Sequence, residues 1–152
     1  MVIVVMGVAL GLVMVQLMPD KQAPLREEGA RLALLLENAG LEARAGGRSI
    51  AWSGENHKYL FFSKNEYGDW EPIDADSAFR PRSMSEGVNI DMISVEEQPV
   101  NPGEYVVLNA HSFAVPFRIS LRSKFGVVTV SGKSTGDVVF SMNEPQVESP
   151  AQ

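Results

Sequence analysis

Few side chains in this sequence have the chemistry of a metal ligand or a general base. Its 152 residues include two histidines, His57 and His111, and no cysteine. A catalytic zinc site commonly takes three protein ligands, and neither histidine has a second histidine four residues away. We therefore interpret His57 and His111 as surface or turn residues, and we expect neither a metal site nor a cofactor.

Other short patterns have the residue types of a known chemistry without its spacing. No serine stands in a G-x-S-x-G sequence, the nucleophile elbow of α/β-hydrolases. Gly132-Lys133-Ser134 ends like a phosphate-binding loop, but the nearest upstream glycine, Gly126, is one residue too far away. The acidic side chains of residues 71–76 lack the spacing and the closing glutamate of an EF-hand. The sequence therefore predicts a chain that is not an enzyme.

Composition limits the partners that this chain can have. The net charge is −6 and the isoelectric point is near 4.9. Without a basic stripe there is little to neutralise phosphates, so we expect no nucleic-acid partner. The absence of cysteine excludes disulfides and thiolate metal sites.

The first 18 residues, MVIVVMGVALGLVMVQLM, contain no charge and one polar side chain, Gln16. As a helix they would span roughly 27 Å, slightly less than a ~30 Å hydrocarbon core. We predict that residues 1–18 form a transmembrane helix segment that also forms a filament core. The residues expected to contact lipid or neighbouring helices are Val2, Val5, Gly7, Leu10, Gly11, Val13 and Leu17.

A cleaved secretory signal is the alternative interpretation of this segment. Such a signal has a basic start, an apolar core of roughly 7–15 residues and small residues at the cut. Here no basic residue precedes the run, and QLMPD offers no small-x-small site. Because Lys or Arg normally marks the cytoplasmic side, we expect that natural residues upstream of Met1 are missing from this sequence.

Residues 19–47 are expected to form an amphipathic helix that continues into a globular head. Pro19 should kink or end the preceding helix, and Pro24 suits the first turn of the next one. Glu27 and Glu28 are expected in that first turn, at the positive end of the helix dipole.

The apolar positions of this helix recur at helical spacing, and the pair Gly46-Gly47 predicts where the helix ends. Such a stripe is typical of core packing, so we expect it to lie across the face of a sheet. The residues predicted to make this helix-to-sheet contact are Leu25, Leu32, Leu35, Leu36 and Ala39.

After residue 47 the apolar period changes to two, which indicates a β-rich domain over residues 48–143. Residues 74–87 and 96–103 are predicted to be loops, and residues 144–152 a flexible tail. In FRISLR the alternation predicts that Arg118 and Arg122 face outward. The predicted strands are 49–53, 57–63, 67–73, 88–95, 105–109, 116–122, 126–131 and 137–142. A single helix followed by short strands predicts an α+β fold with an antiparallel, sandwich-like head.

Several stretches resemble a known family. VIVVMGVALG looks like the interior of a type IV pilin-like N-terminal helix, and EGARLALLLENAGLEARAGGRSIAWS is similar to the helix-to-strand passage of GspH/FimT-type pseudopilins. YLFFSKNEYGDWEPI, FRPRSMSEGVNIDM and HSFAVPFRISLR resemble, in order, a hairpin, an Arg-Pro-Arg loop and a Pro-Phe-Arg strand of the minor pseudopilin H of type II secretion systems. Aligning Gly7 with the family's common helix glycine leaves the Phe-Thr-Leu-x-Glu start and the leader outside this sequence.

The resemblance implies a structural subunit near the tip of the type II secretion pseudopilus, which supports export of folded proteins across the outer membrane. It implies a single-pass protein of the bacterial inner membrane with its head in the periplasm. Prepilin peptidase would trim and N-methylate the precursor. The partners implied are other pseudopilins, inner-membrane lipid before assembly, and exported proteins.

Two alternatives stay open at this point: a FimT/FimU-like minor pilin of a type IV pilus, and a signal-anchored periplasmic binding domain that never polymerises. Arg80, Arg82 and Arg118 are candidates for contacts with neighbouring subunits or cargo. The other interpretation of these arginines is that they are solvated loop residues.

Overall fold

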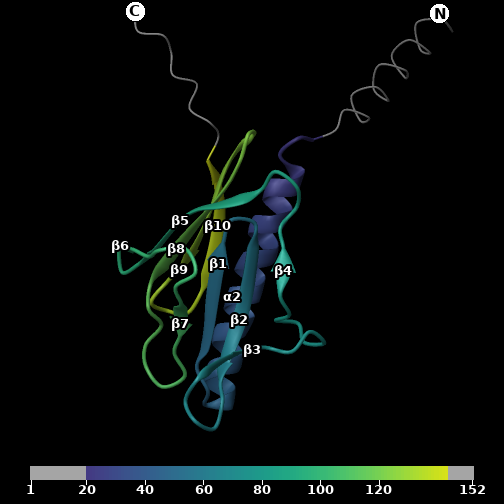
Figure 1. Cartoon of the computed structure of the whole chain (residues 1–152). Coiled ribbons are helices and arrows are strands. Elements are labelled where there is room, and N and C mark those ends of the chain that lie inside the picture. The colour runs from purple at the N-terminus through teal and green to yellow at the C-terminus, as the bar shows by residue number, and fades with distance from the viewer. Residues whose placement is uncertain (1–19, 144–152) are drawn as a thin grey trace, which may run out of the picture.

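The computed structural model describes residues 20–143 (Figure 1). This part of the chain contains one helix, α2 (Ala23–Gly46), followed by ten strands. The predicted segment 1–18, Pro19 and the predicted tail 144–152 lie outside the described residues, and so do Val2, Val5, Gly7, Leu10, Gly11, Val13 and Leu17. Among residues 20–143, no helix is both long and apolar enough to cross a membrane.

Helix α2 has clear signals at both ends. Pro24 lies at its start, and the Asp20 carboxylate accepts a hydrogen bond of 3.0 Å from the backbone N–H of Gln22. The helix ends at Gly46, where the sequence predicted its end, because Gly47 takes a left-handed conformation with φ 67°.

The predicted position of two glutamates was wrong. Because α2 begins at Ala23, Glu27 and Glu28 fall after its first turn, which contains no acidic residue. The acid nearest the helix start is Asp20, before the helix, and Glu28 is buried instead of facing the helix dipole.

The strands form two antiparallel sheets. In the first, the order is β3-β2-β1-β7, with β4 also paired to β2; in the second, it is β10-β9-β8-β5-β6. The first sheet contains β1 (Ile50–Glu55), β2 (Lys58–Lys64), β3 (Trp70–Pro72), β4 (Arg82–Ser83) and β7 (Val106–Leu108). The second contains β5 (Asn89–Val95), β6 (Gln98–Pro99), β8 (Phe117–Ser123), β9 (Gly126–Gly132) and β10 (Val138–Asn143). This architecture confirms the predicted α+β fold.

Two of these strands lie where the sequence predicted loops. β4 and β6 are two residues long, so they have no alternation of apolar and polar side chains to detect. The β5–β6 turn has positive φ at Glu96 (50°) and Glu97 (66°). Tight hairpin turns of this kind usually contain Asn-Gly or Gly, so a pair of glutamates gave no turn signal.

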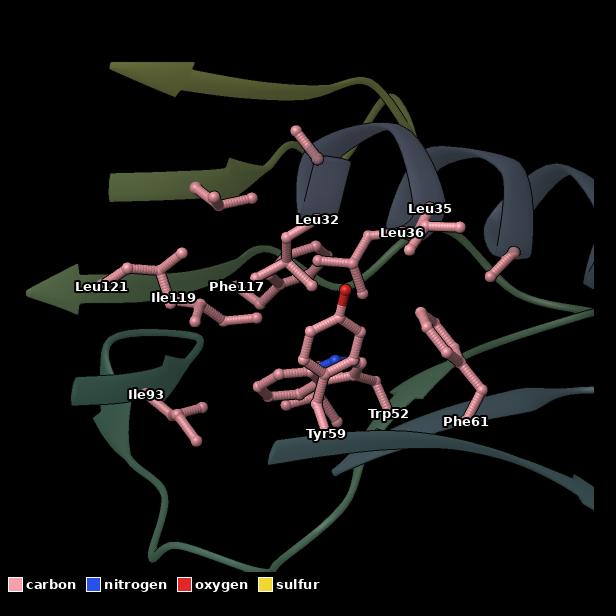
Figure 2. Close-up of a cluster of buried hydrophobic side chains, with 14 of the residues drawn as sticks. Leu32, Leu35, Leu36, Trp52, Tyr59, Phe61, Ile93, Phe117, Ile119 and Leu121 are labelled. Carbon is pink, nitrogen blue, oxygen red and sulfur yellow. The ribbon is translucent and has the colours of Figure 1, made fainter. Parts of the chain in front are cut away.

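The core lies between α2 and the inner faces of both sheets. Figure 2 shows Leu32, Leu35 and Leu36 projecting from α2 toward Trp52, Tyr59 and Phe61 of the first sheet. The second sheet adds the side chains of Ile93, Phe117, Ile119 and Leu121 to the same cluster. The helix therefore holds the two sheets together as one body.

Helix α2 lies very close to β9 at Gly29. A Cβ atom placed there would lie 2.4 Å from Cγ1 of Val128 on β9. Only a residue without a side chain leaves room for this contact.

Candidate assembly surfaces

The residues with catalytic potential are not brought together. His57 is exposed in the turn between β1 and β2, and His111 is exposed in the loop after β7. In the part of the chain that the structure describes, no three His, Asp or Glu side chains converge to hold a metal ion. Lys133 begins the turn between β9 and β10, where its N–H donates to the carbonyl oxygen of Asp137 at 2.9 Å.

The predicted helix-to-sheet residues lie in the core. Leu25, Leu32, Leu36 and Ala39 are at most 1% exposed, and Leu35 is 8% exposed. They belong to a core in which α2 contacts β1 and β7 of the first sheet and β8, β9 and β10 of the second. Burying one such leucine contributes about 1.5–3 kcal/mol, so this stripe is what attaches α2 to the head.

The buried carboxylate of Glu28 belongs to the same stripe and was not predicted from the sequence. It is 2% exposed, and its Oε1 accepts hydrogen bonds from the backbone N–H of Ser85 at 2.9 Å and from the Ser85 hydroxyl at 2.8 Å. Arg31 approaches the same oxygen at 3.3 Å. Glu28 therefore ties the loop of residues 74–87 to α2. Its spacing, three residues after Leu25 and four before Leu32, was the signal that it faces the core.

Two large polar side chains lie in the same interior. Tyr59 is 1% exposed, and neither its hydroxyl nor Oε2 of Glu28 has a hydrogen-bond partner among residues 20–143. Burial and, to a smaller extent, the nearby negative charge of Glu28 together raise the pKa of Tyr59 to about 12. The phenol of Tyr59 therefore stays protonated across the ordinary pH range.

The outer face of α2 carries two leucines that have no cover. Leu34 is 62% exposed and Leu41 is 53% exposed. They are seven residues apart, which is about two helical turns, so both lie on the same side of the helix. Between them on this side lie Glu37 and Asn38, so the two leucines are separate apolar side chains and not a continuous stripe. The predicted helix-to-sheet stripe left out both Leu34 and Leu41, but no role of their own was predicted for these two leucines.

The three arginines proposed as contacts lie in different environments. Arg80 is exposed in the loop before β4, and Arg118 is exposed on the outer face of β8, between Ser94 and Ser131 of the neighbouring strands. Arg82 is half-buried, and its Nη2 donates to the carbonyl oxygen of Ala78 at 3.3 Å. Arg82 therefore has a structural contact of its own, whereas Arg80 and Arg118 extend into solvent.

Similarity to known proteins is found at the level of structure. No protein-family model matches the sequence, and no curated protein matches it. Two structures of the minor pseudopilin EpsH from the type II secretion system of Vibrio cholerae are similar to this chain. One has a TM-score of 0.61 at 15% identity and covers 80% of this chain and 97% of EpsH. The other has a TM-score of 0.66 at 11% identity and covers 84% of this chain and 100% of EpsH.

The solution structure of Escherichia coli GspH is also similar, with a TM-score of 0.57 at 17% identity over 85% of this chain and 94% of GspH. The likeness spans nearly the whole of each of these proteins. This chain therefore has the fold of the minor pseudopilins, one N-terminal helix followed by antiparallel sheets.

Proposed function

We propose that this chain is a minor pseudopilin, a structural subunit near the tip of a type II secretion pseudopilus that supports export of folded proteins across the outer membrane. The fold is that of EpsH and GspH over most of the chain. The apolar sequence of residues 1–18 is suited first to lipid and then to a bundle of neighbouring helices. The role proposed is one of assembly and not of catalysis.

The exposed pair Leu34 and Leu41 is the observation that supports assembly most directly. Both leucines lie on the side of α2 that faces away from the sheets, while the opposite side is fully buried. Covering each one contributes up to about 1.5–3 kcal/mol, so a neighbouring helix gains from packing there. In the proposed filament this surface continues the apolar contacts of residues 1–18 into the head.

The proposal includes a location and a set of partners. Residues 1–18 anchor the chain in the bacterial inner membrane as a single pass, and the head lies in the periplasm. Prepilin peptidase is proposed as the processing enzyme, and other pseudopilins at the filament tip are the proposed partners. Arg80 and Arg118, exposed on different parts of the head, are proposed as contacts with a neighbouring subunit or with an exported protein.

A charge on the helix face tests this function. The double variant Leu34→Glu/Leu41→Glu, expressed in a host deleted for the wild-type gene, should lose incorporation into the filament and release of secreted proteins. Its head should keep the wild-type denaturation midpoint, because both side chains are exposed. Tyr67→Glu, at an 88% exposed position in the turn after β2, is the matched control and should secrete normally.

The same strains separate the alternatives. Normal protein release with loss of twitching motility would assign the chain to a type IV pilus. A chain that cross-links to no other pilin-like subunit through residues 1–18 or through Leu34 and Leu41 would be an anchored binding domain instead. Full secretion by the double glutamate variant would contradict the proposed assembly face.

A further inference from the structure

The end of the head at which α2 begins carries a small surface that is both basic and aromatic. It is formed by Lys21, just before the helix, and by Lys124 and Phe125, which make the turn between β8 and β9. The Phe125 ring is 37% exposed, and the ammonium groups of Lys21 and Lys124 lie 5.7 Å and 6.0 Å from its centroid. We call these three residues the basic patch.

The basic patch is held in place by the structure around it. The side-chain amide of Gln22 donates to the carbonyl oxygen of Phe125 at 3.1 Å, and the N–H of Phe125 donates to the Ser123 hydroxyl at 3.1 Å. These bonds join the hairpin turn to the segment that enters α2. Figure 1 shows the β8–β9 turn at the same end of the head as the start of α2.

The charges of the basic patch are available to an anion. Asp20, the acid next to it in sequence, is paired with Arg26 at 3.0 Å. Within residues 20–143 neither Lys21 nor Lys124 forms an ion pair, although Glu86 lines the same shallow hollow. The net charge of −6 does not cancel this local positive charge. Salt screens charges that lie more than about 8–10 Å apart. Because α2 alone is about 36 Å long, acidic side chains at the far end of the head do not act on the basic patch.

The short distance along the chain from residue 18 to Lys21 places the basic patch near the membrane surface, provided that residues 1–18 lie in the hydrocarbon as the proposed function states. Three residues, from Met18 to Lys21, span at most about 11 Å. The headgroup layer on each side of the bilayer is roughly 5–8 Å thick. Lys21 must then lie within or directly beside the layer of lipid phosphates.

We propose that the basic patch docks the head on an anionic phospholipid bilayer before the subunit enters a filament. Lys21 and Lys124 contact lipid phosphates, and the Phe125 ring enters the boundary between headgroups and acyl chains. Lysines beside an aromatic ring are the composition of interfacial binding surfaces. This inference rests on the membrane anchor of the proposed function and adds a defined orientation of the head.

A tryptophan probe measures the position of the basic patch. The full chain carrying Phe125→Trp is inserted into vesicles of equimolar phosphatidylcholine and phosphatidylglycerol with brominated acyl chains, and the signal of the unsubstituted chain, due to Trp52 and Trp70, is subtracted. We expect the new indole to be quenched.

The matched control is Phe113→Trp. Phe113 is 91% exposed in the loop after β7, and the neighbouring Ala110 N–H donates to the Ser49 hydroxyl at 3.1 Å, beyond the far end of α2. Its indole should remain unquenched. Equal quenching at the two positions would overturn the proposal.

The lysines are tested separately from the ring. In the Phe125→Trp background, each change of Lys21 or Lys124 to Gln should weaken docking about fivefold, whereas changes to Arg should preserve it. Docking should also fall in vesicles of phosphatidylcholine alone. The proposal would be overturned if quenching were the same with and without the two lysines and with and without anionic lipid.

Other occupants of the basic patch give different results. The segment 144–152 contains two glutamates and no Lys or Arg, and it follows Asn143, whose carbonyl lies near Gly126. If quenching appears only when the chain ends at Asn143, the tail occupies the patch and the proposal fails. Cross-linking at position 125 to another pseudopilin, without quenching, would assign the patch to a protein.

Failure of the anchor itself is a separate outcome. A chain that does not float with the vesicles at all would contradict the membrane location of the proposed function. A chain that floats but leaves the Phe125→Trp indole unquenched would contradict only the docking of the head.

Discussion

At the residue scale, the molecule depends on a buried carboxylate that joins two segments distant in sequence. Glu28 accepts both the backbone N–H and the hydroxyl of Ser85, across 57 positions of the chain. A buried donor that loses its acceptor costs about 1–3 kcal/mol. The loop of residues 74–87 is also held by the short strand β4 and by the buried side chains of Phe79 and Met84, and the Glu28 contact is the one that ties it to α2.

We expect Glu28→Ala to lower the free energy of unfolding by about 1–3 kcal/mol, because it leaves the Ser85 N–H without its acceptor. Glu27→Ala is the matched control, since Glu27 is the adjacent glutamate on the same helix and is exposed. It should change stability by at most about 0.5 kcal/mol. Urea denaturation of both variants measures the difference, and equal midpoints would contradict the role given to Glu28.

The ionisation of Tyr59 should make the free energy of unfolding depend on pH under alkaline conditions. Its pKa is raised to about 12 in the folded state, whereas an unfolded tyrosine has the ordinary value of 10.0. Between these two pH values the unfolded chain holds fewer protons than the folded one, so rising pH favours unfolding. The stability associated with the neutral phenol is complete below pH 10 and is lost progressively as pH rises toward 12.

Denaturation between pH 9 and pH 12 should therefore show a shallower loss of stability for Tyr59→Phe than for the wild type, by up to roughly 1 kcal/mol per pH unit. Near neutral pH the same variant should be no less stable, because it removes a buried hydroxyl without a hydrogen-bond partner among the described residues. Tyr67→Phe, at an exposed position, should follow the wild-type curve. Parallel curves for all three proteins would exclude Tyr59 as the group responsible.

At the scale of elements, the fit of α2 against β9 is set by a glycine. Gly29→Ala would place a methyl group 2.4 Å from Val128 Cγ1, and the β-branched Val128 side chain has few rotamers in which to move away. Overpacking of this kind typically costs about 1–3 kcal/mol, more than the gain of about 1 kcal/mol from replacing a helical glycine.

Gly40→Ala in the same helix is the control, since its new methyl group would meet only the flexible Arg44 side chain at 3.5 Å. We expect Gly29→Ala to lower the thermal midpoint and Gly40→Ala to leave it unchanged or raise it. A Gly29→Ala protein as stable as the wild type would mean that α2 can shift along β9.

Elements with a strong apolar period were predictable from the sequence. The leucine stripe gave α2, and strict alternation in segments such as FRISLR gave β8, with Arg118 and Arg122 exposed on its outer face. β4 and β6 were missed because a two-residue strand is held by backbone pairing that leaves no pattern in the side chains.

The candidate surfaces were less predictable than the fold. Helical spacing put Leu35 and not Leu34 in the predicted core stripe, and in the structure Leu35 is buried and Leu34 exposed. The spacing did not predict that Leu34 and Leu41 would form an exposed apolar pair. The basic patch joins Lys21 to Lys124 and Phe125 across about a hundred residues, through a contact between Gln22 and Phe125 that spans 103 positions. No local pattern contains that pairing.

At the scale of the whole molecule, the proposed assembly depends on residues 1–18, which lie outside the described residues and are known here by sequence alone. Leu10→Arg places a charge in the middle of this apolar run, with an insertion penalty of about 2.5–3.5 kcal/mol. We expect this variant to be lost from the membrane fraction and from filaments, while Leu10→Ile behaves as the wild type. A fully assembling Leu10→Arg protein would contradict the membrane-to-filament path.

The alignment of α2 with its strands has a mechanical consequence. Figure 1 shows β1, β2 and β10 extending alongside the helix. A pull applied at Asp20, where the head meets the preceding segment, therefore acts along this shared direction and loads the buried leucine stripe in shear. The contacts of Leu25, Leu32, Leu36 and Ala39 must then yield together and not one after another.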